Sequence, residues 1–168
     1  TSDFSSNRIE GLGSVLRREG YTTSFFHGAE NGTMYFDSFS QRAGFQHYFG
    51  LNEYPQKEDS DGHWGIFDEP YFQFAVREID KMREPFASVI FSLSSHQPFS
   101  VPKKYAGRFP KGTLEIHESI GYTDFSLRKF FSEAEKRPWF HHTLFVITAD
   151  HTTKSDQASY SDSLGHFR

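Results

Sequence analysis

Apolar and polar positions along the chain predict three units, each made of a helix followed by a strand. Apolar residues at helical spacing predict helices over 9–16, 68–84 and 113–135. Short apolar runs predict strands over 21–26, 86–93 and 143–149. Helices that alternate with strands in this way are typical of an α/β fold, in which a parallel sheet is covered by helices.

The predicted strands carry histidines and a carboxylate at their carboxyl ends. His27 follows the first strand, His96 lies in the loop after the second, and Asp150 and His151 follow the third. Crossovers between parallel strands are right-handed, so the strands point the same way and their ends share one edge of the sheet. We expect these four side chains to converge there, where open α/β sheets bind their ligands.

The stretch 28–67 is rich in Gly, Asp, Asn and aromatic residues. It predicts a long irregular excursion, and long loops of this kind in compact domains are often functional. Trp64 lies within it, and we expect the indole to anchor the loop, with stacking on a ligand as the alternative. Residues 152–168 are polar and are predicted to be loop.

Composition narrows the function classes. The net charge of the 168 residues is -4, which argues against an electrostatic nucleic-acid binder. There is no cysteine, and this excludes a disulfide framework, a cysteine-ligated zinc site and a cysteine nucleophile within the chain. No apolar run approaches the roughly 20 residues of a membrane helix. Because the chain begins at Thr1, we expect it to be a piece of a longer protein.

Asp150 and His151 suit a divalent metal, since carboxylate oxygens and neutral imidazole nitrogens are good ligands for zinc or manganese. Two ligands do not complete a metal site. The alternative to a metal-binding role is that Asp150 caps a turn and His151 is an ordinary surface residue. His96 suits hydrogen bonding to an anionic oxygen or protonation of a leaving group, and an ordinary loop histidine is the alternative. His27 is a weaker candidate for a residue that faces the substrate.

Taken in order, the motifs resemble the sulfatase-type catalytic domain of lipoteichoic acid synthases, in the alkaline phosphatase superfamily. The resemblance is carried by Phe26-His27-Gly28, Asn31-Gly32-Thr33-Met34, Trp64-Gly65-Ile66, Ser95-His96-Gln97-Pro98-Phe99, Tyr122 with Asp124, and Ala149-Asp150-His151. It covers nearly the whole chain. It implies a three-layer α/β sandwich with a mostly parallel sheet, alkaline phosphatase-like and incomplete.

The resemblance implies transfer or hydrolysis of phosphate or sulfate esters at a divalent metal ion, whether manganese, calcium, magnesium or zinc. Asp150 and His151 would be metal ligands, His96 would contact the anionic group, and His27 would lie in the same pocket. The substrate would be a sulfated or phosphorylated glycan or lipid at the extracytoplasmic face of a bacterial membrane. Membrane attachment would come from segments outside this chain, and exposed sheet edges would allow a homodimer.

The chain departs from the family pattern in two places. The family's nucleophile lies upstream of the Phe-His-Gly motif, so residues 1–168 are expected to be the C-terminal portion of one catalytic domain without its nucleophile, inactive alone and binding metal weakly or not at all. The glycerolphosphate-binding members carry a Trp and an Arg after the first histidine, where this chain has Met34-Tyr35-Phe36. The substrate class therefore stays open between a sulfate ester and another phosphate ester.

Three alternatives stay open beside this reading. The first is a phosphoethanolamine transferase or phosphodiesterase of the same superfamily. The second is a non-catalytic binding module that retains the fold. The third is an α/β domain whose histidines are incidental.

Overall fold

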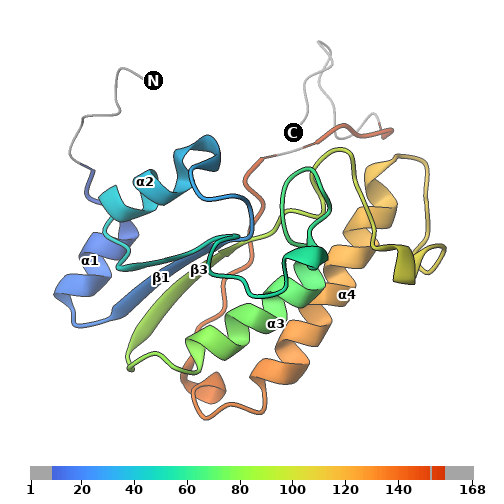
Figure 1. The fold of residues 1–168 in the computed structure, drawn as a ribbon. Helices are drawn as coiled ribbons and strands as arrows, with labels where there is room; N and C mark the ends of the chain where they lie inside the picture. Colours follow the sequence, from blue (N-terminus) through green and yellow to red (C-terminus); the bar gives the residue numbers. More distant parts are fainter. Residues whose placement is uncertain (1–8, 152, 158–168) are drawn as a thin grey trace.

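The computed structural model describes residues 9–151 and 153–157, and its sheet is built from parallel strands in the order β2-β1-β3. The central strand β1 spans Thr22–His27 and is flanked by β2, His47–Phe49, and β3, Phe86–Phe91. The β1–β3 register runs from Thr22 opposite Phe86 to His27 opposite Phe91. Figure 1 shows β1 and β3 side by side with a common direction, so their carboxyl ends meet at one edge, as predicted.

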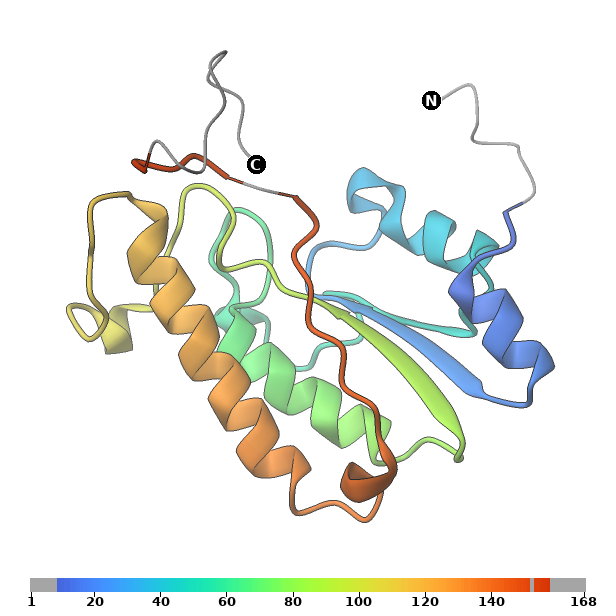
Figure 2. The same cartoon turned by 180° about the vertical axis from the view of Figure 1, so that it is seen from behind.

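Helices cover both faces of the sheet, as Figures 1 and 2 show from opposite sides. On one face lie α1, Leu12–Arg18, and α2, Phe36–Arg42, and on the other lie α3, Asp68–Ile79, and α4, Ile116–Ala134. Single-turn 3₁₀ helices occur at Thr33–Tyr35 (η1), Lys57–Asp59 (η2), Lys103–Tyr105 (η3) and Phe140–His142 (η4). The architecture is therefore the predicted three-layer α/β sandwich.

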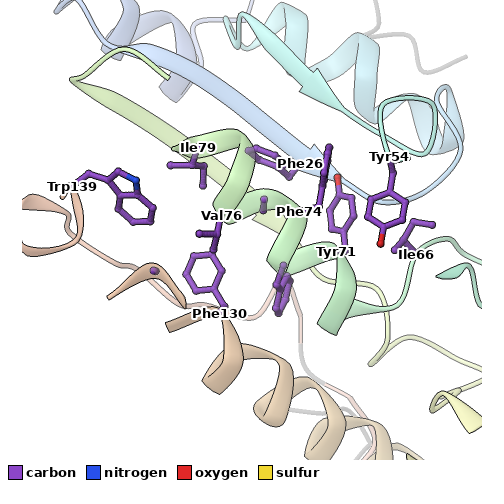
Figure 3. Packing of buried hydrophobic residues seen from close by; sticks show 12 residues of the cluster. Phe26, Tyr54, Ile66, Tyr71, Phe74, Val76, Ile79, Phe130 and Trp139 are labelled. Atoms are coloured by element: carbon purple, nitrogen blue, oxygen red, sulfur yellow. The ribbon is translucent and has the colours of Figure 1, made fainter. Parts of the chain in front are cut away.

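The two faces of β1 bury different aromatic clusters, because successive side chains of a strand point to opposite sides. Phe25 packs with Ala43 and Phe45 on the side of α2. Phe26 is fully buried on the side of α3, with its ring 4.5 Å from that of Phe49. Figure 3 shows this second cluster extending along α3 to α4 and Trp139. These clusters fix the sheet between its helices.

The stretch 28–67 is more regular than predicted, because it contains α2 and β2. β2 is only three residues long, too short for an alternating pattern to mark it in the sequence. The helix predicted over 68–84 also ends earlier, at Ile79, and a turn occupies the residues that follow. Residues before a proline disfavour helical backbone, which fits an end ahead of Pro85.

The strand predicted over 143–149 is wrong. The segment is irregular, and Leu144, Val146 and Ile147 are 87%, 78% and 68% exposed. Figure 2 shows it as an extended trace without a strand arrow. A buried parallel strand needs side chains packed against both of its faces. In this segment Phe145 packs into the cluster around α4 and η4, while its strongly apolar neighbours face outward.

Candidate functional site

The loops that follow β1 and β3 start beside each other, because His27 and Phe91 are partners in the parallel ladder. The loop that contains Trp64 joins them. The Ile66 N–H donates to the carbonyl of Gly28 at 3.0 Å, and the Trp64 indole N–H donates to the carbonyl of Gln97 at 2.6 Å. The prediction that Trp64 anchors its loop is confirmed, and the anchor connects the His27 loop to the His96 loop.

Gly65 makes this junction sterically feasible. Its φ is +156°, and a Cβ at this position would lie 2.3 Å from the carbonyl oxygen of Gly28. Real Cβ atoms essentially never approach a backbone oxygen so closely, so only glycine allows the two loops to pack together here. The Trp64-Gly65-Ile66 motif therefore serves to pack its loop against the loop that follows β1.

His27 is buried, with 1% of its surface exposed. Its ring lies 4.3 Å from that of Phe36 and 5.5 Å from that of Phe91, and its Nδ1 is 3.1 Å from the Tyr48 hydroxyl. Burial lowers the pKa of His27 to about 4, and burial together with the charges of Asp37 and Glu53 raises the pKa of Tyr48 to about 12. At neutral pH both groups are uncharged, so His27 offers hydrogen bonding but no positive charge.

His96 is exposed and tightly constrained. Its ring centroid is 4.1 Å from that of Trp64, and its Nδ1 lies 2.9 Å from the carbonyl oxygen of Gln97. The backbone of Phe99, three residues after His96, has a positive φ of 60°. An imidazole that is accessible but held from two sides is suited to meeting a ligand in one orientation.

Asp68 connects the start of α3 to the beginning of the loop that follows β3. Its Oδ1 accepts hydrogen bonds from the N–H groups of Leu93, at 2.8 Å, and Ser94, at 3.1 Å. Its Oδ2 accepts one from Thr123 of α4 at 2.7 Å. Burial raises the pKa of this carboxyl, against the effect of these hydrogen bonds. Phe67 occupies the N-cap position of α3, and Asp68 is the first residue of the helix.

Asp150 and His151 lie at the end of the irregular segment, with side chains 58% and 72% exposed. The His151 N–H donates to Asp150 Oδ1 at 2.9 Å, and His151 Nε2 is 3.6 Å from Asp150 Oδ2. The donor types fit a divalent metal. Within residues 9–151 and 153–157, however, no group of three or more His, Asp or Glu side chains is arranged to hold a metal ion. The pair is at most an incomplete donor set in this part of the chain.

Sequence reasoning missed two residues that shape the site. Tyr48 lies on the unpredicted strand β2, opposite Phe25, and this register brings its hydroxyl to His27. Thr123 was not singled out either, although its hydroxyl supports Asp68. The aromatic triplet His47-Tyr48-Phe49 was the only local signal for β2, and it is too short to be decisive.

A surface hollow of about 220 Å³ lies apart from these residues. It is lined by Glu58, Asp59, Phe67, Pro70, Pro102, Lys103 and Lys104. Two acidic and two basic side chains balance in charge, so this hollow does not select an anionic ligand. None of the predicted site residues lines it.

Comparison with known proteins assigns the chain to one family. The sulfatase family model matches residues 3–167. Lipoteichoic acid synthase 1 of Bacillus subtilis is 24% identical over 157 residues, which cover 89% of this chain and 24% of the relative. Phosphoglycerol transferase I of Escherichia coli is 23% identical over 158 residues, 88% of this chain and 21% of the relative. The chain thus spans about a quarter of these relatives.

Solved structures agree on the fold. A protein of the alkaline phosphatase superfamily from Vibrio parahaemolyticus superposes with a TM-score of 0.70 at 23% identity, covering 83% of this chain and 36% of the other. The lipoteichoic acid synthase LtaP from Listeria monocytogenes superposes with a TM-score of 0.69 at 23% identity, covering 79% and 34%. The predicted alkaline phosphatase-like, incomplete α/β sandwich is confirmed.

Proposed function

Since the chain belongs to the sulfatase family, we propose that residues 1–168 are the C-terminal portion of a catalytic domain that transfers or hydrolyses phosphate or sulfate esters. Relatives named lipoteichoic acid synthase and phosphoglycerol transferase support group transfer as the reaction class. The nucleophile would come from residues of the same polypeptide outside this chain, because the matched stretch is about a quarter of each relative.

One observation carries the proposal: the exposed His96 is held at the carboxyl edge of a parallel sheet against Trp64, whose loop is hydrogen-bonded to Gly28, the residue after His27. This edge is where α/β sheets bind ligands. His96 would contact the anionic group of the ester. His27, buried beneath Phe36 and neutral, would shape the pocket and offer a hydrogen bond from within it.

Asp150 and His151 would hold a divalent metal ion, manganese, calcium, magnesium or zinc, together with donors outside the described part of the chain. Their carboxylate and imidazole chemistry supports this assignment, as does their exposure. A bound metal ion in such a site neutralises charge that develops on the transferred group.

The substrate would be a sulfated or phosphorylated glycan or lipid. The names of the relatives favour a phosphoglycerol group. The stretch Met34-Tyr35-Phe36 favours a different ester, because it stands where the glycerolphosphate-binding members carry a Trp and an Arg, and none of its side chains provides the bidentate hydrogen bonding of an arginine to phosphate. A sulfate ester, or a phosphate ester handled by a phosphoethanolamine transferase or phosphodiesterase, fits that observation.

We place the reaction at the extracytoplasmic face of a bacterial membrane, reached through segments outside this chain. In the described residues no helix combines the length and apolarity needed to cross a bilayer. A homodimer formed through exposed sheet edges is part of the same proposal.

The test compares this chain with a longer polypeptide that contains it. With Mn²⁺ present, the longer protein should cleave one of two chromogenic probes, a sulfate ester or a phosphodiester, and the 168 residues alone should cleave neither. His96→Ala should lower kcat/KM of the longer protein by about 100-fold, as expected for loss of a proton-transfer or charge-stabilising group.

His141→Ala is the matched control, because His141 is exposed on η4 and lies outside the predicted site. It should leave kcat/KM unchanged. Turnover by the 168 residues alone would refute the assignment of the nucleophile to another segment. A longer protein that binds the esters without cleaving either would indicate a non-catalytic binding module.

A further inference from the structure

Trp64 and His96 share one hydrogen-bond acceptor. The indole N–H of Trp64 lies 2.6 Å from the carbonyl oxygen of Gln97, and Nδ1 of His96 lies 2.9 Å from the same oxygen. The two rings are also in contact, with centroids 4.1 Å apart and an angle of 55° between their planes. The imidazole is therefore held by a ring on one side and by a hydrogen bond at one nitrogen.

The shared acceptor determines where the imidazole proton lies. A carbonyl oxygen only accepts hydrogen bonds, so Nδ1 of His96 is the donor in this contact. A neutral imidazole has one N–H, and its other nitrogen then carries a lone pair. Nε2 of His96 is consequently the atom left for a ligand, on a side chain that is exposed.

We propose that Trp64 is a positioning residue: its indole N–H holds the Gln97 carbonyl in place, and this carbonyl keeps His96 in the Nδ1–H tautomer, which leaves Nε2 for the ligand. The nature of that ligand, an anionic ester, rests on the proposed function, whereas the tautomer does not. In this tautomer a neutral His96 accepts a hydrogen bond at Nε2. It donates to an anionic oxygen only as the imidazolium, which adds a full positive charge to the hydrogen bond.

The loop around Trp64 is rigid enough for this role. The N–H groups of Trp64 and Gly65 both donate to Asp61 Oδ1, at 2.8 and 3.0 Å. The backbone of Gly65 packs directly against that of Gly28. The indole is thus placed by a segment attached to β1, and it positions a histidine on the loop after β3.

Nitrogen-15 NMR of the imidazole side chains tests the proposal directly. At alkaline pH, where imidazoles are neutral, His96 in the wild-type chain should show a protonated Nδ1 and an unprotonated Nε2. Trp64→Phe keeps an aromatic ring but removes the indole N–H that holds the Gln97 carbonyl. The carbonyl is then free to turn away from Nδ1, so His96 should shift measurably towards the Nε2–H tautomer. An Nε2–H tautomer in the wild type, or an unchanged tautomer in a folded Trp64→Phe chain, would overturn the proposal.

Trp139→Phe is the matched control, because Trp139 is the other tryptophan of the chain and its indole N–H donates to Asp80 Oδ1 at 3.1 Å, away from His96. It should leave the His96 spectrum unchanged. If Trp64→Phe does not fold, the wild-type spectrum alone still decides the tautomer. Added inorganic sulfate or phosphate tests the proposed function separately: no response of His96 would count against ester binding and leave the tautomer result standing.

Discussion

Asp68 and Ser94 hydrogen-bond to each other in both directions. The Asp68 N–H donates to Ser94 Oγ at 3.0 Å, and the Ser94 N–H donates to Asp68 Oδ1 at 3.1 Å. Both residues are buried, at 1% and 4% exposure. Because Ser94 lies two residues before His96, this pair ties the position of the candidate site to the first turn of α3.

Asp68→Ala should destabilise the chain by about 3 kcal/mol, since it leaves the buried N–H groups of Leu93 and Ser94 without acceptors. Asp68→Asn is the matched variant, because its amide oxygen can still accept from those groups, and it should cost less than half as much. Urea denaturation measures both changes. Equal losses in the two variants would show that the carboxylate charge, and not the acceptor geometry, matters at this position.

The buried His27 should make the chain sensitive to acid. Its pKa is lowered from 6.5 to about 4, so the unfolded chain binds a proton between these values while the folded chain does not. The contribution of the neutral, buried His27 to folding stability is fully present above pH 6.5 and is lost as the pH falls from 6.5 towards 4. The free energy of unfolding should decrease over this range by up to about 3 kcal/mol. Urea denaturation midpoints measured at several pH values from about pH 7 to about pH 4 give the dependence of stability on pH.

His27→Gln should flatten that slope, because glutamine does not titrate. His141→Gln provides the comparison, since His141 is exposed and its substitution should leave the slope as it is in the wild type. If His27→Gln denatures with the same pH dependence as the wild type, the acid sensitivity comes from other groups.

Gly65→Ala should destabilise the junction between the loops by about 3 kcal/mol, because its Cβ would collide with the Gly28 carbonyl. Gly62→Ala, in the same loop, is the control: φ is +77° there and no atom lies within 4 Å of the added Cβ, so only backbone strain of about 1 kcal/mol is expected. Thermal unfolding compares the two. A larger loss for Gly62→Ala would contradict the close-packing explanation.

Neighbouring residues of the segment 143–149 should respond differently to substitution by serine. Phe145 lies 5.1 Å from the ring of Phe131 and 5.3 Å from that of Phe140, so Phe145→Ser should cost about 2 kcal/mol. Val146 is 78% exposed, and Val146→Ser should change stability by less than about 0.5 kcal/mol.

Sedimentation velocity adds a second readout to this pair. If exposed apolar side chains of the segment mediate self-association, Val146→Ser should shift the chain towards monomer. A wild-type chain that is monomeric at high concentration would argue against a homodimer formed through this segment.

Local patterns were enough to identify much of the fold. Apolar spacing identified α1, α3 and α4, and short apolar runs identified β1 and β3, because helical and strand periodicities appear within a few turns of chain. The same patterns gave a wrong strand over 143–149. This segment is an apolar run, but within the described residues no layer of the fold packs on its outward side chains. The patterns also failed for β2, whose three residues form a strand only because β1 lies beside them.

The sequence by itself determined the α/β class, the parallel direction of the strands and the placing of His27 and His96 after neighbouring strands. Only the tertiary structure decided that His27 is buried against Phe36 and Tyr48, that Asp68 supports the His96 loop, and that Trp64 and His96 share the Gln97 carbonyl. The physical reason is distance along the chain. Periodicity is a local property, whereas Trp64 and Gln97 are 33 residues apart, and their contact depends on how β1 and β3 align.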